Sequence, residues 1–154
     1  MSKLLEQVLA PKPGRLFEHS IEQAVARGAE SDRLGVAFLG GYAAAITALD
    51  PAIGPSERGA LCATESGGGH PRAILTTLID GKLNGTKHFV SGGSLSTVLL
   101  VVAKVGEKDG RPELKVARIA ANKPGVTVDQ GAPLDFIPEV PHGAVTFKDA
   151  RVDA

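Results

Sequence analysis

The sequence is poor in several features that mark particular classes of protein. Its 154 residues include one cysteine, no tryptophan, and equal numbers of basic and acidic side chains, 17 of each. One cysteine cannot form an internal disulfide, and the first residues lack the apolar core of a signal peptide, so we expect a cytoplasmic protein. Because no basic run stands out, we expect neither a nucleic-acid surface nor an anionic-membrane surface.

Long apolar runs are also scarce. The most membrane-like stretch, residues 34–49, carries no formal charge but is shorter than the ~20 apolar residues that a spanning helix needs. We therefore predict a buried helix there, with Ser31 or Asp32 as its N-cap and Asp50-Pro51 as its end. Its small residues would let another helix approach closely, which must offset the roughly 1 kcal/mol that each glycine costs in a helix.

The residues before this helix also have helical periodicity. Phe17, Ile21 and Val25 recur at i, i+4 and i+8, which predicts an amphipathic helix. Pro11 and Pro13 separate it from a short first helix with apolar residues at 4, 5, 8 and 9. Residues 1–56 are therefore predicted to form a helical N-terminal region.

After Pro55 the hydrophobic period changes from 3.6 to 2. Asp80-Gly81 and Asn84-Gly85 are tight-turn dipeptides, because both residue types tolerate positive φ, and further turns follow at 109–110 and 123–125. Many short strands at such spacing predict an antiparallel barrel or sandwich, so the whole chain is expected to be α+β with a β domain over residues 57–154. The predicted strands are 74–79, 86–90, 95–105, 113–121 and 143–148.

Two short motifs are the most informative part of the sequence. Residues 62–70 read Cys-Ala-Thr-Glu-Ser-Gly-Gly-Gly-His, and residues 84–93 read Asn-Gly-Thr-Lys-His-Phe-Val-Ser-Gly-Gly. The first places a hydroxyl and three glycines at the end of a predicted strand, where backbone amides can approach an anionic cofactor. In the second, Phe89 and Ser91 lie two residues apart, which places both on one face of a regular strand.

With these motifs, residues 59–154 resemble the acyl-CoA dehydrogenase family. The family's middle domain carries Thr-Glu-Pro-Gly-Ala-Gly-Ser followed by Asn-Gly-x-Lys-x-Trp-Ile-Thr-Asn-Gly, and this sequence has Ser66, His70 and Pro71 where the family has proline, serine and aspartate. The helical N-terminal region matches the family only in kind and is shorter. Three further segments agree in order, namely 96–104, 123–128 and 145–152.

The resemblance implies a flavin site and a role for each motif residue. Reduction of a flavin places negative charge on its N1 and C2-carbonyl edge, so a site that uses flavin as hydride acceptor should direct preorganised donors there. The resemblance implies that Thr64 meets this edge and that Ser91 forms a hydrogen bond near N5. It also implies that Phe89 stacks against the ring in place of the family's tryptophan, and that Gly69 and His70 lie near the pyrophosphate and the ligand of FAD.

Each of these residues also fits a purely structural role. Three glycines can form a plain turn, Thr64 and Ser91 are common strand residues, and Phe89 suits a core. A hydrolytic triad is not expected, because no Gly-x-Ser-x-Gly elbow is present. Cys62 has no cysteine partner and the histidines lack paired metal spacing, so we expect no metal site and a small, buried cysteine.

The resemblance also implies partners and missing parts. In the family, a C-terminal helical bundle supplies the carboxylate that removes the α proton, much of the oligomer interface and contacts to FAD. The sequence stops where this bundle would begin, so we nominate no catalytic residue and expect the bundle from a homo- or hetero-oligomeric partner or a longer chain. The implied enzyme is an FAD-dependent oxidoreductase of fatty acid metabolism, with an acyl-CoA substrate and an electron-transfer acceptor.

Three functional hypotheses follow. In the first, the chain is the front part of an acyl-CoA dehydrogenase that desaturates a CoA thioester at the α,β position and is inactive alone. In the second, it is a flavin or acyl-CoA binding module without turnover. In the third, it is a structural partner subunit that keeps the β domain for assembly and binds no cofactor.

Overall fold

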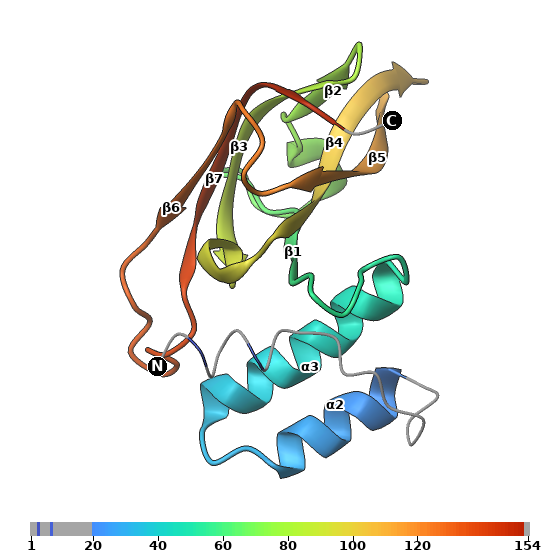
Figure 1. The fold of residues 1–154 in the computed structure, drawn as a ribbon. Coiled ribbons are helices and arrows are strands. Elements are labelled where there is room, and N and C mark those ends of the chain that lie inside the picture. The colour runs from blue at the N-terminus through green and yellow to red at the C-terminus, as the bar shows by residue number, and fades with distance from the viewer. Residues whose placement is uncertain (1–2, 4–6, 8–19, 153–154) are drawn as a thin grey trace.

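The protein consists of helices followed by a curled sheet. The structure is a computed structural model and describes Lys3, Gln7 and residues 20–152. Figure 1 shows α3 lying between α2 and the sheet, so α3 rather than α2 packs against the strands. The elements are α2 (Ser20–Ala29), α3 (Leu34–Leu49), β1 (Gly59–Cys62), the 3₁₀ turn η1 (Pro71–Ala73), β2 (Thr77–Ile79), β3 (Lys82–Ser91), the 3₁₀ turn η2 (Gly93–Leu95), β4 (Val98–Lys108), β5 (Arg111–Ala120), β6 (Val126–Gln130) and β7 (His142–Arg151).

The predicted buried helix is confirmed as α3, with both ends where the sequence placed them. Its N-cap is Arg33, which makes no side-chain capping bond, so the prediction of Ser31 or Asp32 was wrong. The Ser31 hydroxyl instead donates to the carbonyl of Arg27 and closes the end of α2. The expected close approach of a second helix is confirmed at Gly40, where an added Cβ would lie 2.7 Å from the Cβ of Arg27.

The helix expected around Ile21 and Val25 is confirmed as α2, but its apolar stripe is not buried. Ile21 is 75% exposed and Val25 is 66% exposed, whereas Arg27 is buried against α3. Gly40 and Gly41 of α3 instead face Arg27 and Ala24 of α2, whose Cβ atoms lie 2.7 and 3.9 Å, respectively, from a Cβ added at each glycine. Phe17 and the first predicted helix lie outside the described residues.

The α+β prediction is confirmed, whereas the purely antiparallel sheet was wrong. The described residues form a seven-stranded mixed sheet with the order β1-β4-β2-β3-β7-β6, and β5 pairs with β4. Both β1 and β2 run parallel to β4 along one of its edges. β1 pairs with residues 98–101 of β4, and β2 pairs with Lys104. The remaining pairings are antiparallel. The chain therefore leaves the β4 edge after β1, forms an excursion over residues 63–76, and returns as β2.

The core lies on both faces of β4. Leu99, Val101 and Ala103 have no exposed surface and pack within the curled sheet, while Val98 and Leu100 pack under the end of α3. Strands that are buried on both faces read as continuous apolar runs. This explains why the sequence predicted β4 well.

Two short-range predictions were wrong for tertiary reasons. Asn84-Gly85 lies inside β3 rather than at a turn, because the Asn84 side chain accepts a bond from the backbone amide of Asp149 at an irregularity in the β3–β7 pairing. An added Cβ at Gly85 would lie 2.5 Å from the Thr76 hydroxyl, so glycine is required by close approach. The predicted strand 74–79 is confirmed only at β2, since residues 74–76 form an irregular link between η1 and β2.

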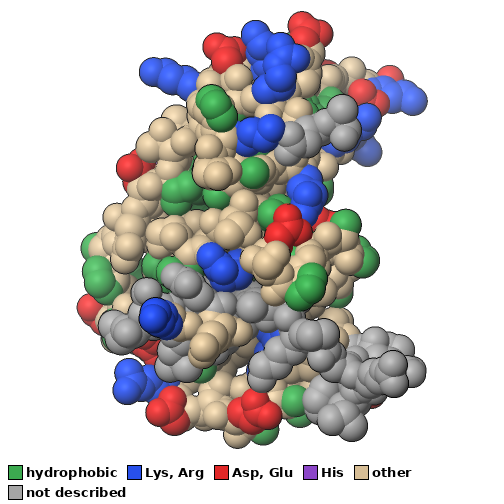
Figure 2. Space-filling model, in the orientation of Figure 1, with side chains coloured by type: hydrophobic (Ala, Val, Ile, Leu, Met, Phe, Trp, Pro, Cys, Tyr) green, Lys and Arg blue, Asp and Glu red, His purple; other side chains and the backbone are tan. Residues whose placement is uncertain are grey.

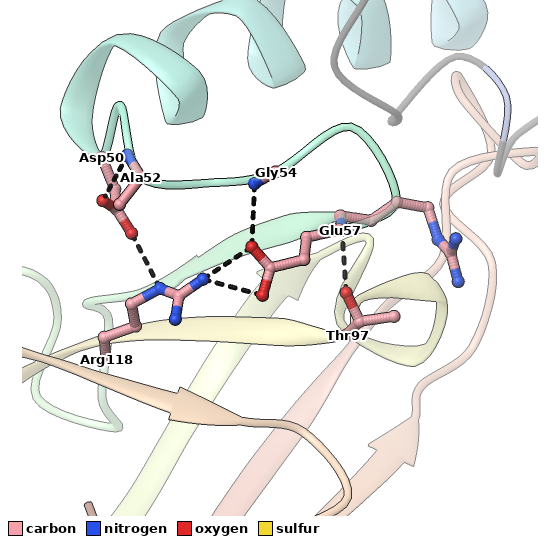
Figure 3. A network of polar contacts seen from close by, with 7 residues as sticks. Asp50, Ala52, Gly54, Glu57, Thr97 and Arg118 are labelled. Carbon is pink, nitrogen blue, oxygen red and sulfur yellow. Dashed lines mark hydrogen bonds and ion pairs between the residues drawn. The ribbon is translucent and has the colours of Figure 1, made fainter. Parts of the chain in front are cut away.

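A polar network joins the helices to the sheet (Figure 3). The Arg118 guanidinium on β5 contacts Asp50 at the end of α3 at 3.1 Å and both oxygens of Glu57 at 2.7 and 2.8 Å. Glu57 also accepts a bond from the Gly54 amide. Nearby, the Arg58 amide donates to the Thr97 hydroxyl. These contacts fix the connection that leads from α3 into β1.

The surface carries charges of both signs. Figure 2 shows acidic and basic side chains mixed at both ends of the visible face, rather than gathered in a patch of one sign. Among the described residues, no helix is both long and apolar enough to cross a membrane.

Candidate functional site

The two sequence motifs lie side by side in the structure. The amide of His88, in the second motif, donates to the carbonyl of Thr64, in the first, at 2.8 Å. The ammonium of Lys87 donates to the carbonyl of Ala63 at 3.2 Å. The excursion that follows β1 is therefore held against the middle of β3, which brings the Thr64 segment beside the strand that carries Phe89 and Ser91.

The three glycines of the first motif belong to a tight turn. Glu65 and Gly68 exchange two backbone hydrogen bonds of 3.1 and 2.8 Å, with Ser66 and Gly67 at the tip. Gly68 has a φ of +98°, which glycine adopts readily. Gly69 follows next to Thr64, since an added Cβ there would lie 3.7 Å from the Thr64 hydroxyl.

The hydroxyls of Thr64 and Ser91 are free to bind an external group. Both residues are half-buried, and neither hydroxyl forms a hydrogen bond within the described part of the chain. By contrast, the hydroxyls of Thr97 and Ser96 are engaged in hydrogen bonds. Two half-buried donors without internal partners are a feature of ligand sites, where they fix the orientation of a bound molecule.

Phe89 is the most exposed aromatic side chain near the motifs. It is 70% exposed, between the half-buried His88 and the buried Val90. From Lys87 to Val90 the chain of β3 advances three residues while β7 advances two, so β3 has a bulge there, and Phe89 takes a φ of +53°. Without the extra residue, Phe89 would share the inward face of Lys87. The bulge therefore directs the ring out of the core, as bulges next to active sites often do.

His70 is exposed at the start of η1. Its Nδ1 accepts a hydrogen bond from the Arg72 amide at 3.2 Å. In the neutral ring this contact places the proton on Nε2. The exposed side of the ring can therefore act as a donor.

A buried ion pair under the motifs was not predicted. The Lys87 ammonium lies 2.7 Å from the Glu65 carboxylate, and the side chains are 0% and 6% exposed, respectively. The Glu65 carboxylate also accepts bonds from the amides of Leu75 and Thr76 at 2.8 and 3.0 Å. Burial raises the pKa of Glu65, but the bonds from Lys87 and these amides outweigh it and lower the pKa below its ordinary value. Glu65 is therefore held ionised and fully engaged.

Aromatic side chains of α3 adjoin the second motif and were also not predicted. Phe38 stacks on Tyr42 with ring centroids 5.9 Å apart, and lies 6.5 Å from the ring of His142. His142 is the β7 neighbour of Ser91. The Tyr42 hydroxyl accepts a bond from the Leu61 amide on β1 at 2.7 Å, while burial raises its pKa to about 12. Tyr42 thus ties α3 to the strand that leads into the first motif.

The remaining candidates are structural or inert. Cys62 is fully buried, as predicted, and burial raises the pKa of its thiol to about 12. Such a thiol is a poor nucleophile at neutral pH. Among the described residues, no three His, Cys, Asp or Glu side chains are grouped to hold a metal ion.

Comparisons with known proteins agree with this geometry. The family model described as "Acyl-CoA dehydrogenase, middle domain" matches residues 60–150. The structure is similar to the FAD complex of PigA, with a TM-score of 0.78, 18% identity and coverage of 99% of this chain and 48% of that one. For butyryl-CoA dehydrogenase from Megasphaera elsdenii the values are 0.71, 19%, 99% and 48%. A comparison with curated protein sequences finds no match.

A third similar structure is the acyl-CoA dehydrogenase complexed with FAD from Bacillus anthracis, with a TM-score of 0.76, 19% identity and coverage of 98% of this chain and 31% of that one. These likenesses define the class of fold, which is short helices followed by the curled, mixed sheet of acyl-CoA dehydrogenase structures. The family match covers more than half of the sequence, and the chain belongs to the acyl-CoA dehydrogenase family. It spans about half of the length of the first two structures.

Proposed function

We propose that this chain forms the flavin-facing part of an FAD-dependent acyl-CoA dehydrogenase. The observation that carries the proposal is the arrangement of Thr64, Phe89 and Ser91 on two joined segments. Among the described residues, neither hydroxyl has a hydrogen-bond partner, and a bulge turns the Phe89 ring out of the core. These positions are the ones at which the resemblance implies contacts to the flavin ring.

Each residue has a defined part in this proposal. Bound FAD would supply a hydride acceptor at its N5. Thr64 would donate to the N1 and C2-carbonyl edge, where negative charge develops, and Ser91 would donate near N5. Phe89 would cover one face of the ring, and Gly69 and His70 would lie toward the pyrophosphate.

The engagement of Glu65 argues against this carboxylate as the catalytic base. Glu65 is the carboxylate adjacent to Thr64, and its oxygens are engaged by Lys87 and by two backbone amides. A base must be free to reach the proton it removes. We therefore propose that the base comes from a helical bundle on a partner subunit or a longer chain, with an acyl-CoA substrate and a separate electron acceptor. We also propose that residues 1–56 form a helical region, that residues 57–154 form the β domain, and that the protein is cytoplasmic.

The engagement of Glu65 also favours the second hypothesis for the chain by itself. Without a bundle, it would act as a flavin-binding or acyl-CoA-binding module that does not turn over. A structural subunit that binds no cofactor is the remaining alternative. Cofactor titration separates these hypotheses, because the first two require flavin or acyl-CoA to bind and the third does not.

The central test is FAD binding by the Thr64→Val variant. Valine keeps the shape but removes the hydroxyl donor, so we expect roughly tenfold weaker binding, the effect of losing one good hydrogen bond, and a lower reduction potential. Thr77→Val is a matched control, because Thr77 is also half-buried on a strand and lies outside the motifs. A variant that equals the parent in a fluorescence titration and a redox titration would show that Thr64 is only a structural residue.

Turnover is tested by acyl-CoA-dependent reduction of a dye acceptor. The chain alone should show none, because positioned acid–base catalysis typically contributes 10²–10⁴-fold. Addition of a polypeptide that carries the helical bundle should produce activity. Robust desaturation by the 154-residue chain alone would contradict the proposal and return attention to Glu65 and His70.

A further inference from the structure

The buried pair of Glu65 and Lys87 lies under the proposed flavin site and has no assigned role. The Lys87 side chain has no exposed surface, which is rare for lysine. Its ammonium is satisfied by the Glu65 carboxylate at 2.7 Å and by the Ala63 carbonyl at 3.2 Å. The carboxylate is satisfied in turn by the ammonium and by two backbone amides. Both charged groups of the pair are thus engaged, in an interior whose other buried polar side chains among the described residues include Thr76.

Stability alone is a weak reason for such a pair. Moving two charges out of water is costly, and replacing a buried ion pair by apolar side chains of similar volume is often neutral or stabilising. The neighbouring core of Leu83, Val90 and Val145 is apolar and fully packed. A pair of apolar side chains would suit this interior, so the charges call for a different explanation.

The pair links the two motifs at the positions next to the proposed flavin contacts. Glu65 follows Thr64 directly and also closes the glycine turn through its own backbone. Lys87 precedes His88, whose amide donates to the Thr64 carbonyl, and it begins the bulge that exposes Phe89. An ion pair has a directional requirement that apolar contacts lack, so a slip of either segment would leave a buried charge without its partner.

We propose that the buried Glu65–Lys87 pair is a positioning element that holds the Thr64 segment and the Phe89 bulge in register for cofactor binding. The claim about cofactor binding rests on the proposed function, because it takes FAD as the ligand. The claim that the pair sets the register of the two segments does not depend on any ligand. Neither side chain contacts the cofactor in this account. Both act through Thr64 and through the segment around Phe89.

The test uses the full chain with the double substitution Glu65→Gln/Lys87→Met. These side chains approximate the size of the originals, remove both charges together and avoid leaving one charge buried alone. Lys104→Met/Glu107→Gln is the matched control, because that ion pair is similarly short, at 2.9 Å, but its side chains on β4 are 33% and 56% exposed. Circular dichroism and thermal melting establish that each variant is folded.

Hydrogen exchange of the His88 amide gives the first readout, and it needs no cofactor. The amide should exchange at least about tenfold faster in the double variant, as expected when a protected bond opens locally, and remain as in the parent in the control. Amides of residues 99–102 on β4, which lie before the control substitutions, should be unchanged in both variants. Unchanged exchange at His88 in a folded double variant would overturn the proposal.

FAD titration gives the second readout, in a cycle with Thr64→Val. We expect roughly tenfold weaker binding in the double variant, and little further loss when Thr64→Val is added, because the hydroxyl is already misplaced. Independent effects would instead add. Full additivity, or FAD binding equal to that of the parent, would overturn the role in cofactor binding.

The two readouts keep this inference distinct from the proposed function. If the parent chain binds no FAD, the proposed function fails and the cofactor half of the inference fails with it, while the exchange result still decides whether the pair sets the register. If the double variant does not fold, Glu65→Asp takes its place, since it keeps both charges and shortens one side chain by a methylene. The same exchange and titration results are then expected, and their absence overturns the proposal.

Discussion

Phe89 combines an exposed ring with a backbone conformation that is unfavourable for a bulky residue, and this predicts that glycine and alanine at this position differ in stability but not in FAD binding. Its φ of +53° lies in the left-handed region, which L-residues other than glycine, asparagine and aspartate rarely adopt. Alanine and glycine at this position both remove the ring. They differ only in the Cβ that opposes the left-handed conformation.

The magnitude follows from two terms. The left-handed conformation costs a non-glycine residue roughly 1–2 kcal/mol, and glycine loses about 0.5–1 kcal/mol relative to alanine through the entropy of the unfolded chain. Phe89→Gly should therefore be more stable than Phe89→Ala by up to about 1.5 kcal/mol, with a midpoint of about 0.75 kcal/mol. For a chain of 154 residues, each kcal/mol corresponds to a shift of about 2–4 °C in Tm.

Urea unfolding of both variants provides the assay. Val116 supplies the control, because it is exposed on β5 and is not among the residues with positive φ; there glycine should be less stable than alanine by about 0.5–1 kcal/mol. FAD should bind equally weakly to both Phe89 variants, since both lack the ring. If Phe89→Gly is less stable than Phe89→Ala, the argument from backbone strain is refuted.

Three further outcomes are expected. Hydrogen exchange should be slowest over residues 99–103, which form the centre of β4 with alternate side chains fully buried; fast exchange there would contradict the sheet assignment. Arg118→Gln should lower the free energy of unfolding by about 1 kcal/mol, an effect that added salt should diminish because the pairs are partly exposed; a loss unaffected by salt would argue against ion pairing. Because the folded-state pKa of Glu65 is lowered from 4.5, its contribution to stability is present above that pH and is lost as the pH falls further. A parent and a Lys87→Met variant with the same acid dependence of stability would argue against this linkage.

The sequence predicted those elements that are determined by neighbouring residues. The helix α3 was predicted from its uncharged run and its stop at Asp50-Pro51, and the structure confirms both. The Asp80-Gly81 turn is confirmed, with positive φ at both residues. The run that became β4 was recognisable because both of its faces are buried.

Features that depend on contacts between distant segments were not predictable in this way. Asn84-Gly85 has the composition of a tight turn, but the bond of Asn84 to Asp149 and the approach of Thr76 to Gly85 keep both residues within β3. The parallel pairing of β1 and β2 with β4 also has no local signal. Likewise, the regular alternation that placed Phe89 and Ser91 on one face did not include the bulge, which is visible only in the pairing with β7.

The ion pair of Glu65 and Lys87 was predictable in part. The sequence indicates that Lys87 is buried, but it does not identify the partner. Leu83 and Lys87 are four residues apart in one strand, and regular alternation places them on the same face, which is the core face of Leu83. A lysine on such a face requires a buried acceptor, so a partner could have been inferred from the sequence. Its identity could not, because Glu65 reaches Lys87 only through the excursion between β1 and β2, whose path depends on the parallel edge of β4. Glu65 could thus not be identified as the partner from local sequence, although in our proposal it fixes the relative position of the two motifs.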